Sequence, residues 1–139
     1  MVNNRSMPDC TVIPELAYPD VGVAASWLRD AFGFQVRLRI ANHRIQMTVG
    51  DGALVLTTQP ADRTAAPGAG LGHSMMIRVA DVDAHHAHAM ARGVTILSGP
   101  ETHVYGERQY TAIDFVGRAW KFSQSVADAV PEDWGATRD

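Results

Sequence analysis

A charged side chain, Lys121, interrupts an otherwise apolar run in residues 119–122. The segment before it, which begins at Asp114 and contains a glycine, is typical of a tight turn between two strands. If residues 118–124 form a strand, Trp120 and Phe122 point to one face and Lys121 to the other. Because the two rings belong in a core, we expect Lys121 to line a pocket and to attract an anionic or carbonyl-rich molecule. The alternative is a solvent-exposed lysine on an edge strand.

The same alternation places further side chains around Lys121. Glu15, Met76 and Arg78 are expected on the pocket side of their strands, with Gln46 close by. Glu15 and Lys121 would pair across the pocket, and each would offset the cost of burying the other.

Two more residues are candidates because of their chemistry rather than their position. Tyr110 offers a ring and Arg108 a guanidinium, which suit planar or anionic ligands, although alternation leaves open which face Tyr110 occupies. Apolar walls would complete a typical small-molecule site. The predicted ligand-binding residues are therefore Ile13, Glu15, Gln46, Met76, Arg78, Arg108, Tyr110 and Lys121.

The segment 81–90 invites a metal interpretation that we consider the weaker one. Asp81, His85 and His88 stand at helical spacings, and two histidines one turn apart can bind zinc when a third ligand converges on them. His86 lies nearest the apolar stripe, so we expect His85 and His88 to flank that stripe in water.

Hydrophobic periodicity and turn signals predict two similar halves. A helix over 21–32 should be capped by Asp20 and ended by Gly33, and a second helix should run from Asp81 to Gly93. One strand precedes each helix and three follow it, which gives the order βαβββ twice. The predicted organisation is a tail at 1–10, a module at 11–59, a linker at 60–72, a module at 73–125 and a tail at 126–139. We expect an α+β fold in which the two βαβββ modules form a curved mixed sheet.

Composition narrows the class of protein. The chain has 139 residues and a formal charge of −3, with no run of Lys or Arg, so nucleic acid is not an expected partner. A single cysteine, Cys10, cannot form an internal disulfide, which favours a reducing cytoplasm. Cys10 also has no adjacent His or cation that would activate it as a nucleophile. No signal peptide is evident, and no apolar run is long enough to span a bilayer.

Three stretches in this order resemble the vicinal-oxygen-chelate superfamily of glyoxalase I, bleomycin-resistance proteins, fosfomycin-resistance enzymes and extradiol dioxygenases. They are YPDVGVAASWLRDAFGF, VADVDAHHAHAMARGV and YGERQYTAIDFVGRAWKF. The last is similar to the family's Asp-Pro-x-Gly turn and final strand, with Phe115 in place of the proline. The resemblance implies the glyoxalase/bleomycin-resistance-like fold and a homodimer.

Enzymes of this superfamily typically hold one divalent metal with His, Gln or Glu side chains in the cup of the sheet. The resemblance places the corresponding positions at Ile13, Ser74, Lys121, and Leu56 or Thr57. None of these residues is a good ligand, and a lysine would repel a metal. We therefore expect no metal and no other cofactor.

Two functions remain open from the sequence. The first is a metal-free protein that sequesters a drug or metabolite, in the style of the bleomycin-resistance branch. The second is an enzyme of the lyase, isomerase or dioxygenase type, with a divalent metal at the shifted positions Glu15, Gln46 and His73, or without metal and with Glu15 or Tyr110 as general base. A third alternative is a domain whose cup is filled by its own side chains and which acts through partners.

Overall fold

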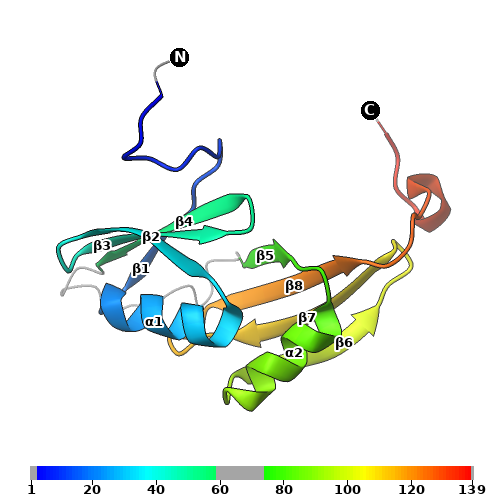
Figure 1. Cartoon of the computed structure of the whole chain (residues 1–139). Helices are drawn as coiled ribbons and strands as arrows, with labels where there is room; N and C mark the ends of the chain where they lie inside the picture. Colours follow the sequence, from blue (N-terminus) through cyan, green and yellow to red (C-terminus); the bar gives the residue numbers. More distant parts are fainter. Residues whose placement is uncertain (1–2, 59–73, 139) are drawn as a thin grey trace. The chain divides into compact units, whose positions relative to one another are not determined.

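The computed structural model describes residues 3–58 and 74–138, so the linker predicted at 60–72 and His73 lie outside the described residues. The chain forms two compact units, Met1–Pro67 and Gly68–Asp139. Each unit contains one βαβββ module (Figure 1). The predicted α+β fold with two such modules is confirmed, and each module has a mixed four-stranded sheet of its own.

The first module consists of β1 (Glu15–Tyr18), α1 (Val21–Phe32), β2 (Gln35–Ile40), β3 (Arg44–Val49) and β4 (Gly52–Thr58). Its sheet has the order β1-β4-β3-β2. β1 runs parallel to β4, whereas the other neighbours are antiparallel. The connection between the parallel strands β1 and β4 contains α1, β2 and β3, so it is long enough for the crossover that a parallel pair requires.

The second module repeats this topology. It consists of β5 (Met75–Arg78), α2 (Val82–Ala91), β6 (Thr95–Thr102), β7 (Glu107–Ile113) and β8 (Ala119–Ser125) in the order β5-β8-β7-β6. β5 is parallel to β8, and the other neighbours are antiparallel. A short 3-10 helix, η1 (Pro131–Trp134), follows in the tail.

Both helices begin at the aspartates that the sequence predicts. The Asp20 carboxylate accepts a hydrogen bond from the Val23 amide at 3.0 Å, and Asp81 accepts one from the Ala84 amide at 3.0 Å. An N-terminal cap of this kind typically stabilises a helix by about 1 kcal/mol. Gly33 ends α1 with a left-handed φ of 81°.

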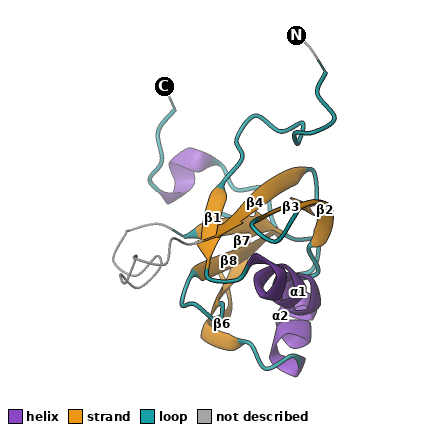
Figure 2. Ribbon diagram, turned by 90° about the vertical axis from the view of Figure 1, so that its left-hand side faces the viewer, coloured by secondary structure: helices purple, strands orange, loops and turns teal. Residues whose placement is uncertain are grey.

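Each helix covers one face of its own sheet (Figure 2). In the first module Leu16, Tyr18, Leu28 and Leu56 are buried. In the second, the core contains Val82, Ala89, Tyr110, Trp120 and Phe122. Because side chains alternate along a strand, the residues between these buried ones project from the face that the helix leaves uncovered.

The strand β6 differs from the expectation. The sequence predicts a strand that ends at Ser98 and a separate segment that begins at Glu101, because Gly99 and Pro100 stand between them. In the structure a single strand passes through both residues, and its pairing with β7 shifts on either side of Ser98. β6 is an edge strand, where a proline costs no ladder hydrogen bond if its nitrogen points outward.

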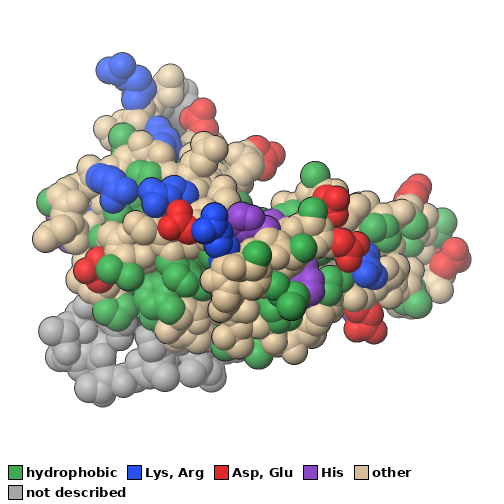
Figure 3. Space-filling model, turned by 60° about the horizontal axis from the view of Figure 1, so that its bottom comes forward, with side chains coloured by type: hydrophobic (Ala, Val, Ile, Leu, Met, Phe, Trp, Pro, Cys, Tyr) green, Lys and Arg blue, Asp and Glu red, His purple; other side chains and the backbone are tan. Residues whose placement is uncertain are grey.

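The described part of the chain contains no helix long and apolar enough to cross a membrane. On the face drawn in Figure 3, Lys and Arg side chains lie among Asp and Glu side chains, and they form no continuous basic stripe on that face. A mixed surface of this kind agrees with the small net charge.

Candidate functional site

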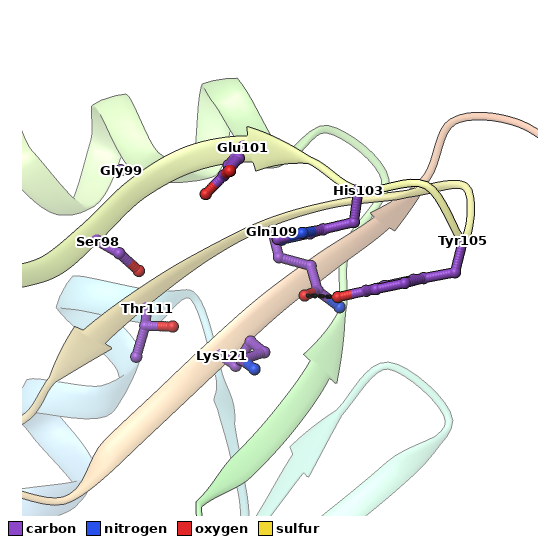
Figure 4. A pocket seen from close by; sticks show the side chains of 8 residues that line it. All are labelled: Ser98, Gly99, Glu101, His103, Tyr105, Gln109, Thr111 and Lys121. Carbon is purple, nitrogen blue, oxygen red and sulfur yellow. Dashed lines mark hydrogen bonds between the residues drawn. The ribbon is translucent and has the colours of Figure 1, made fainter. Parts of the chain in front are cut away.

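A cavity of about 160 Å³ lies on the face of the second sheet that α2 leaves uncovered. Figure 4 shows its lining side chains, which come from β6, β7, β8 and the hairpin between β6 and β7. They are Ser98, Gly99, Glu101, His103, Tyr105, Gln109, Thr111 and Lys121. This pocket is mostly polar, and it holds one cation, one carboxylate and two aromatic rings.

The pairing of the strands arranges the lining in two rows. Lys121 pairs with Thr111, and Thr111 pairs with Ser98, so these three side chains form the first row across the sheet. Gln109 pairs with Glu101 on one side and with Ser123 on the other, and these form the second row. Residues that pair across neighbouring strands project to the same face. The two rows are therefore neighbours on the open face of the sheet, about 7 Å apart along the strands.

The turn before β8 fixes the start of the strand that carries Lys121. The buried Asp114 carboxylate accepts hydrogen bonds from the Arg118 amide at 2.9 Å, the Val116 amide at 3.1 Å and the Trp120 indole at 3.0 Å. Gly117 supplies the left-handed residue of the turn, with a φ of 87°. Because Trp120 is anchored beneath α2, Lys121 must project to the opposite face.

The hairpin between β6 and β7 holds two stacked rings beside the pocket. The rings of His103 and Tyr105 are parallel within 4°, with centroids 5.0 Å apart, and Trp134 packs against Tyr105 at 5.5 Å. Gly106 allows this arrangement, because its φ is 85° and a Cβ there would collide with the carbonyl of Ala127. The Gly106 carbonyl also accepts a hydrogen bond from the Val126 amide at 2.8 Å, which ties the hairpin to the tail.

A chain of directed hydrogen bonds runs through the second row. The Tyr105 hydroxyl donates to Gln109 Oε1 at 3.0 Å, and Gln109 Nε2 donates to Ser123 Oγ at 3.0 Å. Ser123 Oγ then donates to the Glu107 carboxylate at 2.7 Å. Each donor has one acceptor, so the orientation of the Gln109 amide and of the Tyr105 hydroxyl hydrogen is fixed by the chain.

This chain predicts a measurable change in the acidity of Glu107. Hydrogen bonds from Ser123 and then Ser125 hold the pKa of Glu107 below its ordinary value of 4.5, and the charge of Arg78 acts in the same direction. A lowered pKa stabilises the folded state above pH 4.5, and the contribution is lost as the pH falls through the folded value. We expect Ser123→Ala to raise the pKa of Glu107 toward 4.5, as measured by NMR titration of the carboxyl carbon. Ser125→Ala should have the smaller effect, and an unchanged pKa in Ser123→Ala would contradict the hydrogen-bond chain.

Three of the expected site residues share this face of the second sheet. Met76 pairs with Lys121, and Arg78 pairs with Ser123, so both lie at the β5 ends of the two rows. Lys121 is half-buried and lines the cavity, whereas Met76 is 61% exposed beside it. That these residues bind a ligand stays a prediction.

The structure does not bring Arg108 and Tyr110 into the pocket. Tyr110 pairs with Phe122 and lies buried beneath α2, where its hydroxyl is 2.5 Å from Nδ1 of His85. Burial raises the pKa of Tyr110, so this phenol is a poor general base. Arg108 lies on the same side of β7 and forms an ion pair with Asp83 of α2 at 3.1 Å. Both residues connect the sheet to its helix.

One histidine of α2 also packs differently from the expectation. His85, which we expected in water, packs against Phe122 with ring centroids 4.2 Å apart. His86 contacts the edge of the Tyr110 ring at 5.1 Å. Both histidines are half-buried, since α2 turns this side toward the sheet.

In the first module, the expected site residues are engaged by other parts of the chain. The Glu15 carboxylate pairs with Arg44 at 2.6 Å. The expected pairing of Glu15 with Lys121 stays a prediction. The side-chain amide of Gln46 is buried; its oxygen accepts from Arg37 at 2.5 Å, and its nitrogen donates to the Ser6 carbonyl at 2.9 Å. Ile13 is half-buried just before β1.

The N-terminal segment therefore crosses the open face of the first sheet. Besides the bond from Gln46 to Ser6, the Arg37 guanidinium donates to the carbonyls of Arg5 at 2.8 Å and Met7 at 3.2 Å. Three consecutive carbonyls thus bind two side chains of the sheet. A second cavity of about 200 Å³ lies where this segment meets the sheet, and Cys10 is among its lining residues.

These contacts predict that Arg37 holds the N-terminal segment in place. In Arg37→Met we expect faster amide hydrogen exchange over residues 3–10, because two of the three carbonyl contacts are lost. Arg39→Met is a matched control, since Arg39 is exposed on the same strand. Equal exchange in the two variants would show that the segment does not depend on Arg37.

The side chains at the four positions that the family resemblance assigns to a metal do not fit a divalent ion. Lys121 brings a cation, Ile13 has no donor atom, and Ser74 offers only a hydroxyl. Leu56 is buried in the core, and its neighbour Thr57 again offers only a hydroxyl. Stable metal sites in proteins need several imidazole, carboxylate or thiolate donors.

The shifted metal site is also unsupported by the residues that can be placed. Glu15 and Gln46 are held by Arg44 and Arg37, and His73 lies outside the described residues. Across residues 3–58 and 74–138, no group of three or more His, Cys, Asp or Glu side chains is arranged to hold a metal. Among the residues that the structure describes, the donor chemistry therefore gives no support to a metal.

Six side chains of the pocket were not among the predicted site residues: Ser98, Glu101, His103, Tyr105, Gln109 and Thr111. A signal for two of them was present in the sequence. In residues 109–112, Gln109 and Thr111 alternate with Tyr110 and Ala112, which indicates Gln109 and Thr111 on the open face. The register shifts in β6 hide Ser98 and Glu101. His103 and Tyr105 lie in the hairpin that follows β6.

Comparison with solved structures supports the same architecture. The structure of TioX from Micromonospora sp. ML1 is similar with a TM-score of 0.70 and 29% identity, over 84% of this chain and 98% of TioX. A glyoxalase/bleomycin resistance protein from Streptomyces sp. CB03234 has a TM-score of 0.65 and 25% identity, over 81% of this chain and 97% of the other. Lactoylglutathione lyase from Agrobacterium tumefaciens shares the fold, with a TM-score of 0.63 and 17% identity. The match covers 92% of this chain and 98% of the lyase. No curated protein sequence matched the chain.

The match to a family model covers most of both modules. Residues 11–122 match the model of the Glyoxalase/Bleomycin resistance protein/Dioxygenase superfamily. This range contains both α-helices, the strands β1 to β7 and the first half of β8. It therefore includes the pocket and Lys121. The chain belongs to the glyoxalase/bleomycin resistance protein/dioxygenase superfamily.

Proposed function

We propose that this protein binds a small organic molecule without a metal, in the pocket of the second module. One observation carries the proposal: Lys121, at a position that the family resemblance assigns to a metal ligand, projects into a polar pocket. Its ammonium group can bind an anionic or carbonyl oxygen of a ligand directly, which is the contact that a metal would otherwise provide. Sequestration of a drug or metabolite is the function that such a pocket supports best.

The size of the pocket supports a second copy of the chain as part of the site. A volume of about 160 Å³ is below the roughly 300 Å³ at which drug-sized sites begin. Met76 extends an apolar side chain beside Lys121 and is exposed in the single chain. We therefore propose a homodimer in which further protein surface completes the pocket, and light scattering coupled to gel filtration tests this part of the proposal.

Thermal unfolding in the presence of a small-molecule library tests the binding function. A ligand at 100 times its Kd stabilises the folded state by about 2.7 kcal/mol, which raises the Tm by several degrees. The assay should contain EDTA, so that a hit cannot depend on a divalent metal. We expect hits among acidic compounds, and their effect should be lost in Lys121→Met. A library of broad chemistry that gives no shift, or hits that require added metal, would contradict the proposal.

A further inference from the structure

The two rows of the pocket have opposite hydrogen-bonding character. The first row presents the ammonium of Lys121 and the hydroxyls of Thr111 and Ser98, which can all donate. The second row presents the Glu101 carboxylate, which can only accept. The pocket is therefore bipolar, with a cationic row beside an acidic one.

The hydrogen-bond chain strengthens the accepting character of the second row. The Tyr105 hydroxyl hydrogen is committed to Gln109 Oε1, so the phenol oxygen has lone pairs left for a ligand. Both ends of the Gln109 amide are occupied by protein partners. Glu101 and Tyr105 consequently each present an acceptor in the pocket lining, which favours a donor, and most of all a cation.

The part of the chain that the structure describes offers no partner for the charges of the two rows. Within residues 3–58 and 74–138, the side chains of Lys121 and Glu101 have no ion pair or hydrogen bond. The nearby Arg78 differs, because its charge acts on Glu107. Lys121 and Glu101 are two strands and one row apart, about 12 Å between their Cα atoms, so they face different ends of the same pocket.

The rings and the volume restrict what fits between them. His103 and Tyr105 form a flat stack at the second row, against which a planar group can pack. A cavity of about 160 Å³ has room for a single ring with short substituents. Because Lys121 lies on β8 and Glu101 on β6, a ligand that reaches both side chains crosses the two rows and does not follow one strand.

We propose that the ligand is a small aromatic zwitterion, with its carboxylate at Lys121 and its ammonium at Glu101 and Tyr105. This inference rests on the proposed function and adds the chemical class of the ligand to it. Glu101 in the second row favours a ligand that carries an ammonium group over an aromatic acid that lacks one.

A matched series of probes tests the inference by NMR titration of the full chain at low salt. 4-(Aminomethyl)benzoate carries both charges, 4-methylbenzoate lacks the ammonium, and 4-methylbenzylamine lacks the carboxylate. We expect the zwitterion to bind at least about tenfold more tightly than either relative, because each loses one charge-assisted hydrogen bond. The shifted amides should lie in β6, β7 and β8.

The Glu101→Gln variant separates the role of the acidic row from that of Lys121. In this variant the zwitterion and 4-methylbenzoate should bind with equal affinity, whereas Asp128→Asn, which changes an exposed carboxylate in the tail, should keep the tenfold preference. Equal affinity of the two acids for the wild-type protein would overturn the zwitterion but leave the metal-free binding function standing. Absence of binding by all three probes would also overturn it, and the thermal unfolding screen would then decide the proposed function by itself.

Discussion

Lys121→Glu is expected to abolish the binding of 4-(aminomethyl)benzoate, with a loss of affinity of at least about 100-fold. The wild-type ammonium attracts the carboxylate inside a half-buried pocket, whereas a glutamate at the same place repels it. Lys121→Met keeps most of the aliphatic stem and removes the charge, so a loss of about tenfold is expected. NMR titration or calorimetry of the three proteins gives the affinities.

The control for this prediction is a cation outside the pocket. Arg39→Met removes one positive charge from an exposed position on β2, so it changes the net charge in the same way as Lys121→Met. We expect the affinity of Arg39→Met to equal that of the wild type. If Lys121→Glu bound the probe as tightly as the wild type, Lys121 would not be the anion-binding group.

Asp114→Ala is expected to lower the free energy of unfolding by about 3 kcal/mol, the largest effect on stability that we predict for a single polar residue. The carboxylate is buried and accepts hydrogen bonds from two backbone amides and from the Trp120 indole. Its removal leaves these donors buried without the partner around which the turn is built. The Tm should fall by about 10 °C.

Urea denaturation of two further variants shows whether the loss is specific. Asp114→Asn keeps the shape and one acceptor oxygen, so it should lose less than Asp114→Ala. Asp128→Ala changes an exposed carboxylate and should stay within about 0.5 kcal/mol of the wild type. Equal stability of Asp114→Ala and Asp128→Ala would contradict the role assigned to the turn.

The fold could be predicted because its signals are local. Asp20 and Asp81 cap helices by short hydrogen bonds to residues three positions later, and Gly33 adopts the left-handed conformation that ends a helix. Such contacts involve neighbours in sequence, so their residue types and spacing reveal them. The order of the elements then restricts the topology to two similar modules.

Part of the site could be predicted by the same kind of argument. Alternation around Trp120 and Phe122 places Lys121 on the open face of the sheet, where the structure finds a pocket. Tyr110 and Arg108 were chosen for their chemistry, and the pairing of Tyr110 with Phe122 turns both toward α2. The register between β7 and β8 decides this point, and a register is set by tertiary packing.

The residues of β6 show why the rest of the site could not be predicted. Ser98 and Glu101 are separated by an odd number of positions, so strict alternation would put them on opposite faces. The pairing of β6 with β7 shifts twice between Ile96 and Glu101, and both side chains line the pocket as a result. Irregular pairing of this kind has no clear signal in a single sequence.

The superfamily to which the chain belongs explains the scaffold without fixing its chemistry. The chain has both βαβββ modules, and the second module carries the pocket. The positions that the family resemblance assigns to a metal hold a lysine, an isoleucine, a serine and either a leucine or a threonine. On this account the fold supplies a concave, structured surface, and the side chains of the two rows determine what binds there.

The metal content of the purified, untagged protein tests the central claim most directly. The protein should be incubated with Mn, Fe, Ni and Zn, freed of excess ions, and analysed by elemental mass spectrometry. We predict that every metal stays far below one ion per chain, because Lys121 and its neighbours offer no suitable donor set. A ratio near one ion per chain that falls in Glu15→Gln, Gln46→Leu or His73→Ala would contradict the account and favour a metal-dependent enzyme.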